Sequence, residues 1–216
     1  MGGYISYLLL VYTIVILNVN EAFSYGTIKS TFLSRPLRVR TKFTHVCRGM
    51  FFLQMGCEVK IRIVGRKNGS EPWIEDGYKM YETRLRPSTV DLMTIWHKNN
   101  DELVKNVLSE AEKGHTIILL DPLGKKMKSE VFSESMYKWL ENGGSRLTFV
   151  IGGADGLPDD LRFDLNDPMK QSTYSVTRFQ MMSLSDLTFT HQFARTLLAE
   201  QIYRATEIRK GSGYHK

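Results

Sequence analysis

The chain has 216 residues, of which 29 are Lys or Arg and 23 are Asp or Glu. Six of the bases and one acid precede Glu58, so the remainder holds 23 bases and 22 acids. Because residues 58–216 are nearly neutral, their net charge gives no indication of nucleic-acid binding. Both cysteines, Cys47 and Cys57, also precede Glu58, which leaves the body without a disulfide framework or a cysteine-based metal site. The five histidines lack metal-ligand spacing, so no metal is expected.

Residues 1–57 have the composition of a leader, which we exclude from the fold. The apolar run Tyr7–Val19 has the length of a signal-peptide core and is shorter than the roughly 20 residues of a membrane span. We expect a signal-peptide-like segment over 1–23, cleaved near small residues. Residues 24–57 contain six basic residues and no acid, as in a disordered transit peptide.

A signal followed by a transit-like stretch resembles the bipartite leaders of proteins sent to secondary, apicoplast-type plastids. We therefore expect an organellar location, and a membrane contact only through the cleaved signal segment. Mitochondrial import, secretion and an uncleaved anchor followed by a basic linker are the alternatives.

The first half of the body alternates strand and helix patterns. Residues 58–65 (EVKIRIVG) alternate apolar and charged side chains, which predicts a half-buried strand. Glu71-Pro72-Trp73 begins a helix that Pro87 ends. A second strand is predicted over 90–97, and a helix over 100–113.

The second half continues the alternation. The run HTIILL over 115–120 predicts a strand covered on both faces. A helix over 129–141, with Ser129 as its cap, precedes a strand over 146–151. A short strand over 181–184 and a helix from Thr190 or His191 to Arg209 complete the pattern. The body is therefore predicted to be an α/β domain with a mainly parallel sheet.

Three predicted strand ends are candidates for a ligand site, because ligands bind outside the carboxyl ends of an open α/β sheet. They are Leu120-Asp121, Gly152-Gly153 and the loop from Leu184. The segment GGADG has neither the Gly-Lys-Ser/Thr of a P-loop nor the spacing of a dinucleotide fingerprint. A tight strand-to-helix turn explains its glycines equally well. A polar tail, 214–216, follows the last helix, and we expect it to belong to a site.

Five motifs in a fixed order carry a resemblance. They are LLD (119–121), VIGGADGL (150–157), SLSDLTFTH (183–191), LAEQIYRA (198–205) and GYHK (213–216). Together they resemble the RlmH family of SPOUT methyltransferases across 59–216. The resemblance implies that residues 58–216 form one α/β domain with a C-terminal trefoil knot, and that the protein is a homodimer.

The resemblance also implies an activity. The family uses S-adenosylmethionine to methylate N3 of a pseudouridine in large-subunit ribosomal RNA of assembled ribosomes, and the C-terminal tail of one subunit completes the site of the other. The positions that match its cofactor loops are Leu120, Gly152, Leu184, Ser185, Asp186, Leu187, Thr188 and Phe189. Leucine and phenylalanine walls with loop amides suit an adenine ring. Gly152 is expected to let backbone approach the cofactor.

Three residues are expected to serve the reaction. His215 is a candidate for removing or orienting the N3 proton, ahead of Tyr214, and a purely positional role for both is equally open. Arg195 is expected to contact phosphate or the second subunit. Arg204 is open between a family role and a surface ion pair with Glu200.

Two departures from the family pattern bear on the site. Thr190 stands where the family has proline, although threonine can cap the helix. The stretch 162–180 is longer than the family's connection, and we interpret it as a surface insertion. Another RNA substrate, such as transfer RNA, and a non-catalytic ribosome-binding role remain alternatives.

Overall fold

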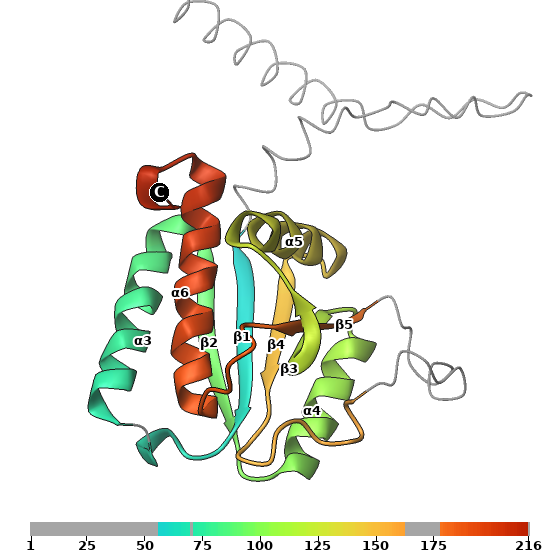
Figure 1. Cartoon of the computed structure of the whole chain (residues 1–216). Coiled ribbons are helices and arrows are strands. Elements are labelled where there is room, and N and C mark those ends of the chain that lie inside the picture. Colours follow the sequence, from blue (N-terminus) through green and yellow to red (C-terminus); the bar gives the residue numbers. More distant parts are fainter. Residues whose placement is uncertain (1–55, 70, 163–177, 216) are drawn as a thin grey trace, which may run out of the picture. The chain divides into compact units, whose positions relative to one another are not determined.

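The computed structural model describes residues 56–69, 71–162 and 178–215 (Figure 1). Residues 1–55 of the predicted leader and most of the predicted insertion lie outside these residues, whereas Cys57, which the prediction assigns to the leader, begins the first strand. Five parallel strands form one sheet in the order β2-β1-β4-β3-β5. The strands are β1 (Cys57–Val64), β2 (Val90–His97), β3 (Thr116–Lys126), β4 (Arg146–Ile151) and β5 (Phe179–Ser183). The prediction of an α/β fold with a parallel sheet is confirmed.

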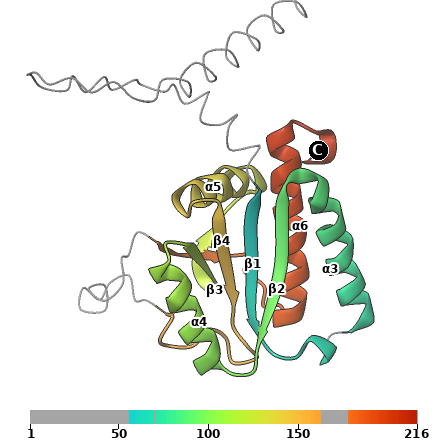
Figure 2. The ribbon, with the colours of Figure 1, turned by 180° about the vertical axis from the view of Figure 1, so that it is seen from behind.

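Four α-helices flank this sheet (Figures 1 and 2). They are α3 (Pro72–Leu85), α4 (Asn100–Glu112), α5 (Ser129–Asn142) and α6 (His191–Lys210). Three short 3-10 turns accompany them: η1 (Lys67–Gly69), η2 (Arg86–Ser88) and η3 (Gly213–His215). The predicted helix limits agree with these bounds to within one or two residues. Within the described ranges, no helix has the length and apolar character needed to cross a membrane.

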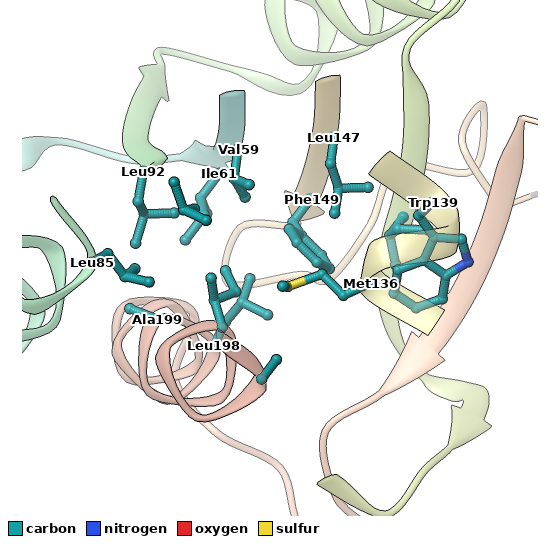
Figure 3. Packing of buried hydrophobic residues seen from close by; sticks show 14 of the residues in the cluster. Val59, Ile61, Leu85, Leu92, Met136, Trp139, Leu147, Phe149, Leu198 and Ala199 are labelled. Atoms are coloured by element: carbon teal, nitrogen blue, oxygen red, sulfur yellow. The ribbon is translucent and has the colours of Figure 1, made fainter. Parts of the chain in front are cut away.

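The larger core lies between the sheet and α3, α5 and α6 (Figure 3). The side chains of Val59, Ile61 and Ile63 on β1 are fully buried there, as their alternation predicts. Phe149 of β4 packs against Phe132 and Trp139 of α5, with ring centroids 6.3 and 6.4 Å apart. Leu198 and Ile202 of α6 are buried in the same core. Burying each such side chain contributes roughly 1.5–3 kcal/mol, so this core holds α6 against the sheet.

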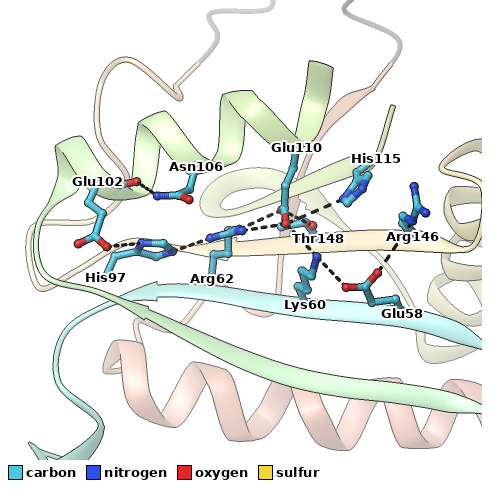
Figure 4. Close-up of polar contacts among 10 residues, drawn as sticks. All are labelled: Glu58, Lys60, Arg62, His97, Glu102, Asn106, Glu110, His115, Arg146 and Thr148. Atoms are coloured by element: carbon cyan, nitrogen blue, oxygen red, sulfur yellow. Dashed lines mark hydrogen bonds and ion pairs between the residues drawn. The ribbon is translucent and has the colours of Figure 1, made fainter. Parts of the chain in front are cut away.

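A smaller core forms on the other face of the sheet, beneath α4. Leu103 and Val107 of α4 pack there with Ile117, Leu119 and Val150. The expectation of a half-buried β1 is therefore incomplete, because α4 covers the face that carries the charged residues. Arg62 on that face is 7% exposed and donates to both carboxylate oxygens of Glu110 on α4, at 2.9 and 2.8 Å (Figure 4).

Two predicted helix caps have different outcomes. Ser129 is the first residue of α5 and not its cap, and its Oγ lies 3.1 Å from Gln201 Oε1 on α6. Thr190 caps α6 as expected, since its Oγ1 accepts from the Phe193 amide at 3.4 Å. The cap fixes the point at which the chain leaves the loop after β5 and enters the last helix.

Candidate active site

A cavity of about 300 Å³ opens at the carboxyl ends of β4 and β5, beside the point where the pairing of β3 with β5 is interrupted between Leu120 and Lys125. Three chain segments supply most of its walls: 120–122, 151–157 and 183–191. They contain the three positions that the sequence predicts as strand ends, although β3 continues past Leu120-Asp121 to Lys126. Seven of the eight expected cofactor residues line the cavity: Leu120, Gly152, Leu184, Ser185, Leu187, Thr188 and Phe189.

The glycine segment makes the floor of this cavity through a tight turn. The Gly156 amide donates to the Gly153 carbonyl oxygen at 3.1 Å, and Gly156 has a φ of +86°. A Cβ on Gly152 would lie 2.1 Å from the carbonyl carbon and oxygen of Gly156. Gly152 is thus required by the approach of the chain to its own backbone, whereas we expected an approach to the cofactor. Residues 152–156 therefore both form a tight turn and line the cavity.

The loop after β5 is held by its own hydrogen bonds. The Ser183 hydroxyl donates to the Ser185 carbonyl oxygen at 2.7 Å, and Ser185 Oγ accepts from the Leu187 amide at 3.0 Å. This geometry turns Leu187 outward, where it is 72% exposed at the edge of the cavity. An apolar side chain that is exposed at a cavity edge suits a flat apolar ligand.

Asp186 does not line the cavity, unlike the rest of its loop. Its carboxylate forms an ion pair with Lys126 at the end of β3, and its side chain is 79% exposed. The ion pair ties the loop to β3. The structure therefore gives Asp186 a contact with the chain in place of the expected contact with a ligand.

The C-terminal tail lies at the opposite end of α6 from the cavity (Figure 1). The Tyr214 ring packs edge-on against Tyr203, with centroids 4.9 Å apart, and the Arg204 guanidinium lies 5.0 Å from the Tyr214 ring centroid. The Tyr214 hydroxyl lies 3.5 Å from Glu200 Oε1. A helix of 20 residues is about 30 Å long, so α6 separates the tail from the cavity of the same chain. His215 belongs to η3, and its side chain is outside the described part.

Comparison with known proteins identifies the family. The family described as "Predicted SPOUT methyltransferase" matches residues 57–215. Ribosomal RNA large subunit methyltransferase H of Protochlamydia amoebophila is 42% identical over 158 residues, which are 73% of this chain and 99% of that protein. The chain belongs to the RlmH family of SPOUT methyltransferases. It is a methyltransferase whose residues 57–215 match the family.

Two more relatives carry the same name. Ribosomal RNA large subunit methyltransferase H of Prochlorococcus marinus is 33% identical over 158 residues, covering 73% of this chain and 96% of that protein. The protein of that name from Halothermothrix orenii is 33% identical over 176 residues, covering 73% of this chain and all of that protein. The matched region therefore corresponds to whole relatives, and this methyltransferase carries additional residues outside it.

Three residues that line the methyltransferase cavity were not predicted as site residues from the sequence: Asp121, Arg162 and His191. Asp121 is 4% exposed, and its carboxylate accepts from Arg162 Nε at 3.2 Å and from the Leu123 amide at 2.9 Å. His191 reaches the cavity from the first turn of α6. The position of Asp121 at a strand end was visible in the sequence. Only the fold brings Arg162 beside it.

Arg195 and Arg204 of α6 both have structural partners in the methyltransferase. Arg195 is 1% exposed, bonds to Glu75 of α3 at 2.5 Å, and has its guanidinium 4.2 Å from the Tyr78 ring centroid. Such burial within the subunit leaves little surface for the expected phosphate or subunit contact, so we assign Arg195 to the packing of α3 on α6. Arg204 forms an ion pair with Glu200 at 2.6 Å, which is one of the two alternatives that the sequence left open.

No metal site is found in the described part of this methyltransferase: its residues include no group of three or more His, Cys, Asp or Glu side chains that could hold a metal ion. Of the expected site residues, seven lie at the cavity, Asp186 and Arg195 form ion pairs within the chain, and Tyr214 lies at the far end of α6. The structure does not bring Tyr214 together with the cavity of its own chain.

Proposed function

We propose that this protein transfers the methyl group of S-adenosylmethionine to N3 of a pseudouridine in large-subunit ribosomal RNA. Membership of the RlmH family supports this proposal, as do the relatives named ribosomal RNA large subunit methyltransferase H. The observation that carries it is the cavity in which seven of the eight expected cofactor residues meet.

The chain offers a fitting holder for S-adenosylmethionine. Leu120, Leu184, Leu187 and Phe189 would provide apolar walls for the adenine ring, and the amides of the 183–189 loop would provide hydrogen bonds. The Gly152–Gly156 turn would form the floor. When bound, the cofactor supplies an electrophilic methyl group on a positively charged sulfur.

The chain's own part in the reaction is positioning and proton removal. S-adenosylmethionine held by the 183–189 loop would supply the methyl group to N3, and the chain would orient N3 and accept the proton that N3 gives up. Burial raises the pKa of Tyr214 to about 12, so its hydroxyl stays protonated and orients rather than removes a proton. We assign proton removal or orientation to His215.

His191 is a second candidate base, because it lines the cavity. Burial lowers the pKa of its imidazole, so the ring is neutral at pH 7 and can accept a proton. If His191 is the base, His191→Gln abolishes the acid limb of the pH–rate profile while His215→Gln leaves it. The reverse result assigns the base to His215.

We also propose a homodimer in which the tail of one subunit completes the cavity of the other. The length of α6 supports this arrangement, because a tail at its far end cannot serve the cavity at its start. We further propose a trefoil knot. β5 lies at the sheet edge, while the following helix α6 packs against α3 beside β1, so residues 184–190 cross the strand ends. Tracing residues 178–191 in a crystal structure tests the knot.

We propose an organellar ribosome as the place of action. The composition of residues 1–57 supports a bipartite plastid leader, and the mitochondrion is the alternative. Residues 1–57 fused to a fluorescent protein should direct it to the plastid. Fluorescence in mitochondria would assign the mitochondrial ribosome instead, and fluorescence in the secretory pathway alone contradicts an organellar place of action.

The direct test is methyl transfer from labelled S-adenosylmethionine by residues 57–216. The substrates are pseudouridine-containing bacterial ribosomes that lack this methyl group, the same RNA free of protein, and transfer RNA. We expect labelled N3-methylpseudouridine on ribosomes, reduced in His215→Ala. Transfer only to another RNA assigns a different substrate, and absence of cofactor binding assigns a non-catalytic role.

A further inference from the structure

A second cavity adjoins the first at the start of α3 and α6. It has a volume of about 840 Å³. Its walls include Gly153, Ala154, Thr188, Phe189 and His191, which also line the first cavity. The two cavities therefore share a wall, and a molecule in the second lies next to whatever fills the first.

Three aromatic rings form a row along this second cavity. Trp73 in the first turn of α3 lies 5.8 Å from Phe193 of α6, measured between ring centroids. Phe193 lies the same distance from Phe189, which reaches into both cavities. Trp73 is 62% exposed, which is unusual for so large an apolar side chain. The row thus runs from an open indole face to the edge of the cofactor cavity.

The chemistry of the second cavity suits a nucleobase better than a phosphate. Glu71 is the acidic residue on its rim, and no Lys or Arg is among its lining residues. A carboxylate repels phosphate, whereas an exposed indole stacks on the face of any base. The side chain of Gln192 and the hydroxyl of Thr190 offer hydrogen-bonding groups to a base edge.

We propose that this second cavity is a stacking subsite for an unpaired base of the RNA substrate, with Trp73 as its platform. The inference rests on the proposed function and adds the residues that receive the RNA. An enzyme that modifies a base must take it out of its stack, and exposed aromatic rings replace the lost stacking. The row from Trp73 to Phe189 leads such a base to the cofactor.

The test compares Trp73→Ala and Trp73→Phe with Met80→Ala in the full chain. Met80 is 40% exposed on the same helix and lines neither cavity. For Trp73→Ala we expect the KM for the ribosomal substrate to rise roughly tenfold, with the Kd for S-adenosylmethionine unchanged. Trp73→Phe, which keeps a ring, and Met80→Ala should remain close to the unmodified protein.

A binding measurement keeps the subsite separate from the proposed function. Hexauridylate with S-adenosylhomocysteine requires no methyl transfer, and it should quench the fluorescence of Trp73. The other two tryptophans are less accessible, because Trp139 is 5% exposed and Trp96 is half-buried against Arg195. The part of the signal that comes from Trp73 is the part that should be lost in Trp73→Phe. Quenching without any methyl transfer would reject the function and keep the subsite.

Two results overturn the subsite. One is normal methyl transfer by Trp73→Ala with an unchanged KM and no Trp73-dependent quenching. The other is a change from dimer to monomer in Trp73→Ala, measured by light scattering, with unchanged RNA binding. That second result would assign the exposed indole to contact with a second copy of the chain.

Discussion

Glu110 is a buried carboxylate at the centre of the polar cluster beneath α4 (Figure 4). Burial alone would raise its pKa, but hydrogen bonds from Arg62, Thr148 and Lys60 outweigh burial and hold the pKa at about 2. Arg62 also donates from Nη1 to His97 Nε2 at 2.9 Å. Since an arginine always donates, this nitrogen accepts, and the His97 ring is neutral. The folded state therefore favours a charged Glu110 and an uncharged His97.

The lowered pKa values of Glu110 and of the buried histidines predict that acid destabilises the fold. Burial lowers the pKa values of His97 and His115, so the unfolded chain binds more protons than the native one below about pH 6.5. The depressed pKa of Glu110 acts in the same direction from about pH 4.5 down to about 2, where its contribution of about 3 kcal/mol is lost. Urea denaturation from pH 8 to about pH 3 should show a falling free energy of unfolding.

Two variants of α4, Glu110→Gln as the test and Glu112→Gln as the control, check this pH dependence. Glu110→Gln leaves Arg62 buried without its counter-charge, which should cost about 3–5 kcal/mol at pH 7 and flatten the curve below pH 4.5. Glu112→Gln, at an exposed position of α4, should change neither. A stability that is constant from pH 8 to about pH 3 contradicts the assignment.

Gly152→Ala is predicted to damage the proposed cofactor cavity. Its Cβ would meet Gly156 backbone at 2.1 Å, so the turn must shift, at a cost of about 2–3 kcal/mol. Calorimetric titration should show cofactor affinity lowered at least tenfold. The matched variant is Gly153→Ala, whose Cβ would meet Val64 at an ordinary 3.5 Å and should leave the free energy of unfolding unchanged. Equal stability of the two variants would refute this assignment.

At the scale of elements, α6 joins the site to the core. Its start carries the Thr190 cap and reaches the cavity through His191. Farther along, Leu198 and Ile202 are fully buried against the sheet face. Arg195 lies between these two parts and ties α6 to α3 through Glu75. The start of α3, which carries Trp73, is therefore held in place by a buried ion pair.

Glu75→Gln is predicted to weaken the α3–α6 contact. The change leaves the Arg195 charge buried without a counter-charge, which should cost about 3 kcal/mol. The comparison is Lys210→Ala at the end of α6. It removes the ion pair between the exposed Lys210 side chain and Glu207, and should cost less than about 0.5 kcal/mol. Thermal unfolding distinguishes them, and similar losses in both variants would contradict a special role for Arg195.

At the scale of the whole molecule, the tail and the cavity stand at opposite ends of α6. The composite site proposed above predicts complementation between two inactive proteins. One carries Gly152→Ala, and the other carries Tyr214→Ala with His215→Ala. After subunit exchange, half of the dimers are mixed, and each mixed dimer has one complete site. About a quarter of the normal methyl-transfer activity should return, and no recovery would mean that the subunits act independently.

The sequence by itself determined the body's α/β class, the order of its elements and most of the cavity. Alternation over 58–65, the apolar run at 115–120 and the helical period after Thr190 are local patterns, and parallel strands bring their carboxyl ends to one edge. The motif resemblance added the family, which the comparisons confirm.

Only the tertiary structure decided which charges are buried and which ends are far apart. Arg62 reads as a solvent-facing residue until α4 places Glu110 opposite it, 48 positions later in the chain. Arg195 reads as a surface arginine until α3 supplies Glu75, and Trp73 reads as a core residue although it stays exposed. These outcomes depend on contacts between residues distant in sequence, which a local pattern of side chains does not contain.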